Sequence, residues 1–126
     1  MPHFTLEHTT NLPALDAQAL LRAANQALFA SGQFGAEIDI KSRAIPLEAF
    51  AVGTAGDGLR GFIHGKLAIL SGRNAEIKRQ LSEAVLAAIE AQYSVPDHMD
   101  VQISVEIVDL DRAAYAKAAH TRRSAT

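Results

Sequence analysis

Four segments of the chain alternate between apolar and polar residues with a period of two, which is typical of strands that bury one face. In the first segment, residues 2–8, Phe4 and Leu6 alternate with polar side chains. The third and fourth segments, residues 59–70 and 101–107, follow the same rule over longer stretches. Their main apolar residues are Ile63, Leu67 and Ile69, and Val101, Ile103, Val105 and Ile107.

The second alternating segment is expected to begin at Ile38. Its period places Ile38 and Ile40 on one face and Lys41 and Arg43 on the other. Two cations therefore share one face of this strand.

Two further segments have apolar residues at helical spacing. We expect the first helix to have Pro13 in its first turn and to end at Ser31-Gly32. The second is expected to follow Asn74 as its N-cap and to run to about Tyr93. The two apolar stripes are Leu20, Ala24 and Leu28, and Ile77, Leu81, Val85 and Ala88.

Two stretches have no clear period. Residues 46–58 contain the run Gly-Thr-Ala-Gly-Asp-Gly, which predicts a turn or a short hairpin. Residues 111–126 are expected to form a short helix that ends in a polar tail.

The order strand, helix, strand occurs twice and predicts a two-layer α/β domain over residues 1–126. Two consecutive β-α-β units would form a four-stranded mixed sheet with both helices on one face. The third strand carries apolar residues on both faces, but two helices cover only one face of a sheet. We expect the other face to meet another subunit, because residues 111–126 offer few large apolar side chains to cover it.

The composition of the chain excludes several kinds of site and of partner. The 126 residues are 48% hydrophobic and include no cysteine, which excludes disulfides, thiolate metal sites and a cysteine nucleophile. The net charge of -2 gives no broad attraction to nucleic acid or anionic lipid. No segment approaches the roughly 20 apolar residues of a membrane span. We therefore expect a cytoplasmic protein that binds neither nucleic acid nor membrane.

Sequence motifs for bound cofactors are missing. The chain contains no phosphate loop, dinucleotide glycine fingerprint or nucleophile elbow, and its histidines lack a metal-ligand spacing. We predict neither a metal nor a cofactor. His64 is expected to be a hydrogen-bonded structural histidine.

The start of the chain carries a candidate general base. A methionine followed by a small residue such as Pro2 is normally excised, which would expose a prolyl amine at the start of a strand. The α-amino group has a reference pKa of about 8, and apolar burial or nearby cations lower it further. Such an amine can take a proton near neutral pH, although many chains begin with Met-Pro for no catalytic reason.

Five short segments, taken together, are more specific than the first two residues. They are Pro2-His3-Phe4, Ile40-Lys41-Ser42-Arg43, Phe62-Ile63-His64, Gly72-Arg73 and Ser104-Val105-Glu106-Ile107. With the two-unit architecture, they resemble the tautomerase superfamily, and within it the 5-carboxymethyl-2-hydroxymuconate delta-isomerase family. The resemblance extends through most of the chain and implies the tautomerase fold.

The resemblance also implies a reaction. A chain-initial proline is the catalytic base of this superfamily, so Pro2 would move a proton within an unsaturated di- or tricarboxylate during homoprotocatechuate breakdown, without a cofactor. Lys41, Arg43 and Arg73 would bind the substrate carboxylates. Lys41 stands where the family is expected to carry arginine, which keeps the charge but loses the bidentate geometry. Longer-chain members are homotrimers, and the same assembly is implied here.

Two alternative functions stay open from the sequence. In the first, the chain is a tautomerase of another 2-oxo acid, such as phenylpyruvate, with Pro2 still the base. In the second, it is a non-catalytic carboxylate-binding module of the same fold. The residues taken singly also have simpler interpretations: Lys41 and Arg43 fit a solvated strand face, and Arg73 fits a surface charge at a turn.

Overall fold

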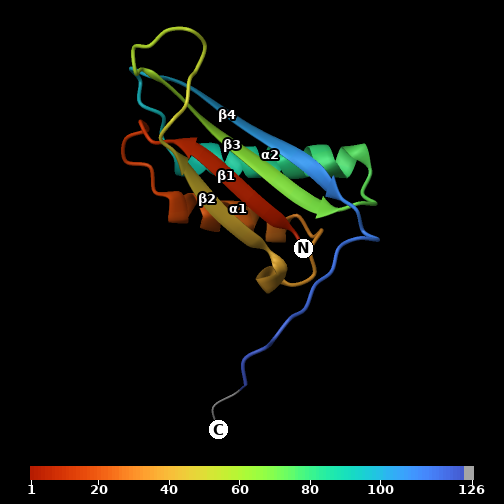
Figure 1. The fold of residues 1–126 in the computed structure, drawn as a ribbon. Coiled ribbons are helices and arrows are strands. Elements are labelled where there is room, and N and C mark those ends of the chain that lie inside the picture. Colours follow the sequence, from red (N-terminus) through yellow and green to blue (C-terminus); the bar gives the residue numbers. More distant parts are fainter. Residues whose placement is uncertain (124–126) are drawn as a thin grey trace.

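A computed structural model describes residues 1–123, which form one mixed sheet with two helices packed against it (Figure 1). In chain order the elements are β1 (His3–Thr9), α1 (Ala17–Ala30), the 3₁₀ helix η1 (Glu37–Asp39), β2 (Lys41–Leu47), β3 (Arg60–Leu70), α2 (Ala75–Gln92) and β4 (Asp100–Leu110).

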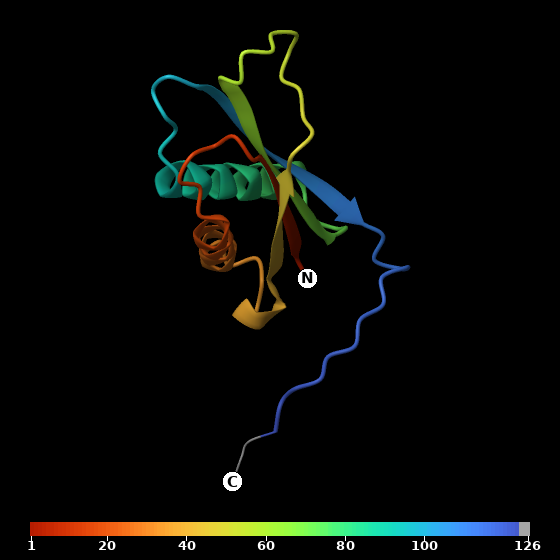
Figure 2. The same cartoon turned by 60° about the vertical axis from the view of Figure 1, so that its left-hand side comes forward.

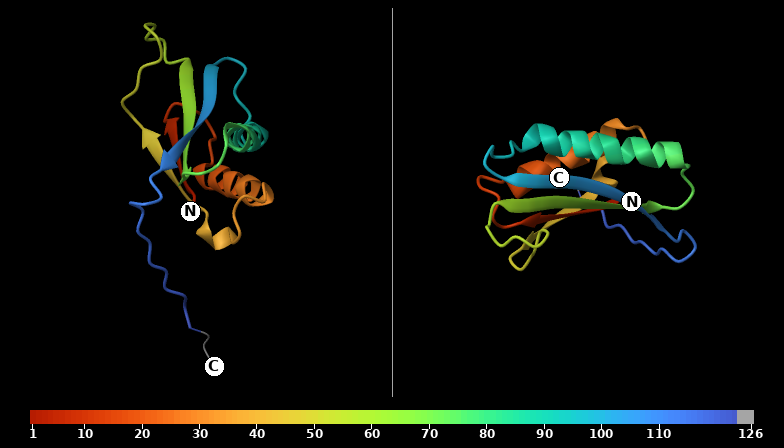
Figure 3. Two further views of the ribbon diagram at one scale, coloured as in Figure 1. Left: turned by 90° about the vertical axis from the view of Figure 1, so that its right-hand side faces the viewer. Right: turned by 90° about the horizontal axis from the view of Figure 1, so that it is seen from above.

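The sheet has the order β2-β1-β3-β4. The pairs β1–β2 and β3–β4 are parallel, and the central pair β1–β3 is antiparallel. Each parallel pair is connected through one helix, and Figures 2 and 3 show both helices on the same side of the sheet. The predicted fold class, two β-α-β units with both helices on one face, is confirmed.

The core lies between the sheet and the helices. The predicted strand positions Phe4, Leu6 and Leu67 are fully buried there. Burying a side chain of this size contributes about 1.5–3 kcal/mol, so these alternating positions fix which face of each strand meets the helices. On α2 the last fully buried position is Ile89 and not the predicted Ala88. The helical residues of the core are Leu20, Ala24 and Leu28, and Leu81, Val85 and Ile89.

Side-chain caps set where the helices begin. The Asn74 side chain accepts a hydrogen bond from the backbone nitrogen of Ile77 at 2.9 Å, as predicted for an N-cap. The prediction of Pro13 in the first turn of α1 was wrong, because Ala14 has a φ of 58° and interrupts a right-handed helix at that point. The helix begins after Asp16, whose carboxylate caps it.

The strand predicted to begin at Ile38 begins at Lys41 instead. Residues 37–39 form a 3₁₀ turn, closed by a 3.1 Å hydrogen bond from the backbone nitrogen of Ile40 to the carbonyl of Glu37. Ile38 is 79% exposed. The cause is the register: His3, the first residue of β1, pairs with Lys41, so β2 has no strand partner before that position.

Of the two segments without a clear period, the first has one of its two predicted forms and the second does not have its predicted helix. The glycine-rich stretch contains a turn at residues 53–54, which is one of the two predicted forms, and it is not a hairpin because no strand is formed between residues 48 and 59. Figure 1 shows it as a loop projecting past the sheet. After β4 the chain forms a single turn, with the nitrogen of Ala114 bonded to the carbonyl of Asp111 at 3.0 Å, and then runs extended. The predicted short helix is absent from residues 111–123. Residues 124–126 of the predicted tail lie outside the described residues.

The second face of the sheet carries the side chains that alternate with the core positions. In β3 and β4 they are half-buried or exposed, and Val108 on the edge strand β4 is 37% exposed. Figure 3 shows no helix on this side. Within residues 1–123 neither helix is long and apolar enough to cross a membrane.

Candidate active site

The amino end of the chain is held in place by strand pairing. The backbone nitrogen of Lys41 donates to the carbonyl of Pro2 at 3.1 Å, and the Pro2 side chain is less than 2% exposed. Because β1 is a central strand, its first residues are fixed on both sides, by β2 and by β3. A group at this end therefore has a defined position.

The terminal amine lies in surroundings that favour its neutral form. The pKa of the Met1 amine is lowered from 8.0 to about 6, mainly by burial and also by a hydrogen bond from Lys41 and the charges of Lys41 and Lys117. Asp39 acts in the opposite direction. While Met1 is present, the nitrogen of Pro2 is part of an amide and cannot act as a base.

Lys41 and Arg43 both project from the face of the sheet opposite the helices. They pair in register with His3 and Thr5, the β1 residues that alternate with the core positions. Arg43 Nη2 lies 2.7 Å from Nδ1 of His3. Burial lowers the pKa of His3, and the charges of Arg43 and Lys41 add to this effect. The structure therefore places two of the three predicted substrate-binding cations next to the start of the chain.

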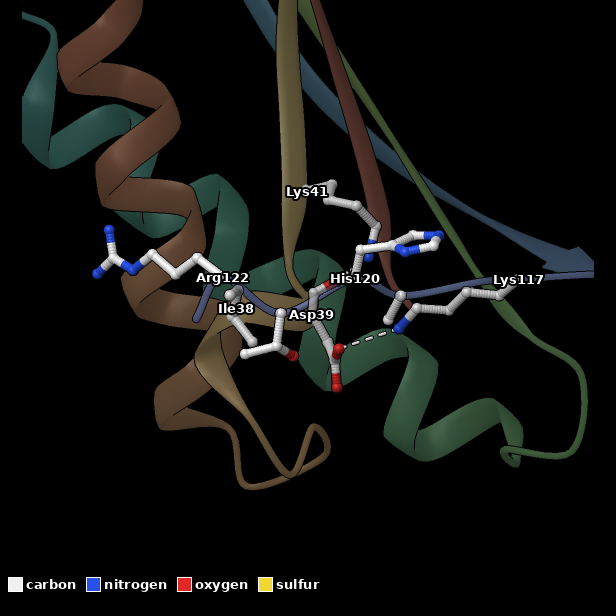
Figure 4. A pocket seen from close by; sticks show the side chains of 8 residues that line it. Ile38, Asp39, Lys41, Lys117, His120 and Arg122 are labelled. Carbon is white, nitrogen blue, oxygen red and sulfur yellow. Dashed lines mark hydrogen bonds and ion pairs between the residues drawn. The ribbon is translucent and has the colours of Figure 1, made fainter. Parts of the chain in front are cut away.

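An open pocket of about 640 Å³ lies beside this end of the sheet (Figure 4). Lys41 contributes from β2, and the segment that follows β4 contributes several side chains. Its lining residues are Ile38, Asp39, Lys41, Lys117, Ala119, His120, Thr121 and Arg122. The pocket thus carries more basic than acidic groups, which favours an anionic ligand.

Arg73 does not line this pocket. Its Nε donates to Oε1 of Gln33 at 3.1 Å and its Nη2 to the Gln33 carbonyl at 2.8 Å. The guanidinium also lies over the ring of Phe34, 4.9 Å from the ring centre. These contacts connect the turn before α2 to the segment after α1, so the structure does not bring Arg73 together with Lys41 and Arg43.

A second polar cluster lies farther along the same sheet face. Nδ1 of His64 is 2.7 Å from Oγ of Ser104, and its Nε2 is 3.6 Å from a carboxylate oxygen of Glu106. Lys66 lies 3.9 Å from the same carboxylate. His64 is therefore hydrogen-bonded, as predicted. Among residues 1–123 no group of three or more His, Asp or Glu side chains is placed to hold a metal ion.

Sequence reasoning missed the residues of the segment after β4. Lys117 Nζ lies 3.0 Å from Oδ1 of Asp39, and the Tyr115 hydroxyl lies 3.1 Å from Nε2 of His3. Both contacts join positions far apart in the chain. The one available signal was Tyr115 itself, a single aromatic residue in an otherwise small and polar stretch.

Comparison with known proteins gives a consistent result. A family model described as 5-carboxymethyl-2-hydroxymuconate isomerase matches residues 2–124. The structure of a 5-carboxymethyl-2-hydroxymuconate isomerase from Deinococcus radiodurans R1 is 28% identical, with a TM-score of 0.81 over 94% of this chain and 90% of that one. No curated protein sequence matches the chain.

Two further solved structures share the fold at lower identity. A 5-carboxymethyl-2-hydroxymuconate delta-isomerase is 22% identical, with a TM-score of 0.79 over 94% of this chain and 89% of that one. A fused 4-OT, described as a symmetric trimer, is 21% identical, with a TM-score of 0.71 over 92% and 91% of the two chains. The chain therefore belongs to the 5-carboxymethyl-2-hydroxymuconate isomerase family and is an isomerase with the tautomerase fold.

Proposed function

We propose that this isomerase shifts a proton in 5-carboxymethyl-2-hydroxymuconate, with the amine of Pro2 as its general base after removal of Met1. The observation that carries the proposal is the electrostatic environment at the amino end, where burial and two lysines hold the pKa of the terminal amine at about 6. A secondary amine at the next position would keep the same strand pairing and the same neighbouring cations. Burial and the same cations are expected to lower the pKa of this amine as well, which favours the neutral form that can accept a proton.

The proposed reaction needs only proton transfer and charge stabilisation. The neutral amine removes the hydroxyl proton of the dienol, the electrons shift along the conjugated system toward the 2-oxo form, and a proton is returned to a carbon farther along it. Lys41 and Arg43 bind substrate carboxylates and stabilise the negative charge that develops. No redox step occurs, so the protein side chains are sufficient.

The structure gives less support to substrate binding by Arg73 than by Lys41 and Arg43. Its substrate-binding role comes from the resemblance, whereas its contacts with Gln33 and Phe34 support a role in holding two connecting segments together. Substrate binding by Arg73 stays a prediction.

We further propose a homotrimer, located in the cytoplasm and acting in homoprotocatechuate breakdown. The trimer is supported by the uncovered sheet face, which carries exposed apolar residues such as Ile45 and Val108, and by solved structures of the same fold that are described as trimers. The absence of cysteine agrees with a reducing compartment. The pathway follows from the proposed substrate alone.

The direct test follows the ultraviolet absorbance of 5-carboxymethyl-2-hydroxymuconate with protein whose first residue has been established by mass spectrometry. We expect turnover by the chain that begins at Pro2. Two controls address the base: Pro2→Ala, which removes the secondary amine, and a chain with one extra residue retained before Pro2, which converts its nitrogen to an amide. Both should lose most of the rate.

Correctly processed protein that does not turn over this compound would refute the substrate assignment. The same assay with the enol of phenylpyruvate then separates a tautomerase of other 2-oxo acids from a non-catalytic carboxylate-binding module.

A further inference from the structure

The segment after β4 is attached to the body of the protein at three points. Both Nε and Nη2 of Arg112 donate to the carbonyl of Ser71, at 3.1 and 3.0 Å. Tyr115 contacts His3 through its hydroxyl and through an edge-on ring contact with 6.3 Å between centroids. The third point is the ion pair between Lys117 and Asp39.

These three contacts reach three different elements. Ser71 lies in the turn after β3, His3 begins β1 and Asp39 ends η1. Figure 1 shows the segment leaving β4 and passing the amino end of the chain. The segment is therefore fixed in direction across the end of the sheet where the proposed base is located.

The segment and β2 together line the pocket beside the amino end. In Figure 4 the side chains of Lys41, Lys117 and His120 gather on one side of the pocket near Asp39, and the guanidinium of Arg122 points to the other side. Lys117 holds the pKa of the Asp39 carboxyl below its usual value, so this carboxylate is charged. Asp39 neutralises one cation only, and a positive excess is left.

We propose that the segment after β4 forms the second wall of the substrate pocket and that Lys117, on the same side of the pocket as Lys41, binds one carboxylate of an unsaturated di- or tricarboxylate. The inference deepens the proposed function and rests on it for the identity of the substrate. Lys41 and Lys117 both line the pocket, so each ammonium group can donate a charge-assisted hydrogen bond to a ligand that carries two or more carboxylates. Asp39 and Tyr115 act as positioning residues, since they hold the segment rather than the ligand.

The test measures binding without catalysis. Tricarballylate, a saturated tricarboxylate that cannot tautomerise, is titrated calorimetrically into the full-length protein at constant ionic strength. Lys117→Gln should weaken its binding about fivefold, because the variant loses a charge-assisted contact at a partly exposed site. The matched control is Lys78→Gln: Lys78 also pairs with a single aspartate, Asp109, at 3.2 Å, but it lies on α2 away from the pocket.

If both variants weaken tricarballylate binding equally, the effect comes from overall charge and the inference is overturned. It is also overturned if the unmodified protein does not bind tricarballylate. Isomerisation is assayed in parallel on the same variants. If the unmodified protein isomerises the substrate and Lys117→Gln has the same KM, the proposed function stands and the role of Lys117 is refuted. If Lys117→Gln weakens tricarballylate binding but the unmodified protein does not isomerise the substrate, the role of Lys117 stands and the proposed function is refuted.

Discussion

Arg43 and His3 form a 2.7 Å hydrogen bond that determines which nitrogen of the histidine carries its proton. A guanidinium has no acceptor, so Arg43 must donate and Nδ1 must offer a lone pair. The neutral ring then carries its proton on Nε2 and donates it to the Tyr115 hydroxyl oxygen at 3.1 Å. One chain of hydrogen bonds thus connects β2, the start of β1 and the segment after β4, through Arg43, His3 and Tyr115.

This relationship predicts the titration of His3. The pKa of His3 should lie below 6.5 because of burial and the neighbouring cations, and Arg43→Gln should raise it. Since the pKa is lowered in the folded state, the contribution of His3 to stability is present above pH 6.5 and is lost as the pH falls through the folded-state pKa. Nuclear magnetic resonance titration of the histidine ring protons measures the shift. An unchanged His3 pKa in Arg43→Gln would contradict the contact. The control is Arg79→Gln, on the outer surface of α2, which should leave the His3 pKa unchanged.

The terminal amine should respond to its neighbours with opposite signs. Lys117→Gln removes a cation and should raise the pKa of the first amine, whereas Asp39→Asn removes an anion and should lower it. Measurement is by pH titration of the α-amino group in the chain that retains Met1 and by the pH dependence of kcat/KM in the processed chain. Shifts of the same sign in both variants would show that the two residues act on the amine through structure and not through charge. Lys78→Gln should leave the pKa unchanged.

Gly65 should be essential for packing behind the amino end. A Cβ added at this position would lie 2.6 Å from ring atoms of Phe4, which is fully buried two residues after Pro2. Gly65→Ala is expected to destabilise the protein by about 1–3 kcal/mol, as overpacked cores usually do. Gly35→Ala is the matched control, because a Cβ there meets no atom within 4 Å. Urea denaturation of both variants checks the difference, and equal stabilities would contradict it.

Arg73 should contribute to stability through its fixed geometry. Arg73→Lys keeps the charge but loses the paired contacts with Gln33 and the stacking over Phe34. We expect a loss of about 1–2 kcal/mol in the free energy of unfolding, of the size given by a few hydrogen bonds and a cation–π contact. Thermal unfolding and KM are measured together. A raised KM at unchanged stability would instead assign Arg73 to substrate binding, as the resemblance implies.

Local patterns in the sequence were sufficient for the fold but not for the whole site. Phe4 and Leu6 could be placed by alternation, and Asn74 by its capping chemistry, because each depends on immediate neighbours. The start of β2 could not, since it is set by where β1 begins to pair with Lys41. Tyr115 and Lys117 could not be placed either: their contacts with His3 and Asp39 cross most of the chain, and the segment that carries them has no periodicity.

The uncovered sheet face gives a test of the proposed trimer that does not depend on catalysis. Val108 lies on this face, on the edge strand β4, and is 37% exposed, whereas Val95 is 36% exposed in the connection between α2 and β4. A charge at the centre of a subunit contact would be buried without a partner, which costs several kcal/mol, while a charge at an exposed loop costs little. We therefore expect Val108→Glu to dissociate the assembly and Val95→Glu to leave it intact. Light scattering coupled to gel filtration gives the molar mass, three times the 13.5 kDa chain for the unmodified protein and for Val95→Glu. A Val108→Glu variant that remains a trimer would place the contact on another surface.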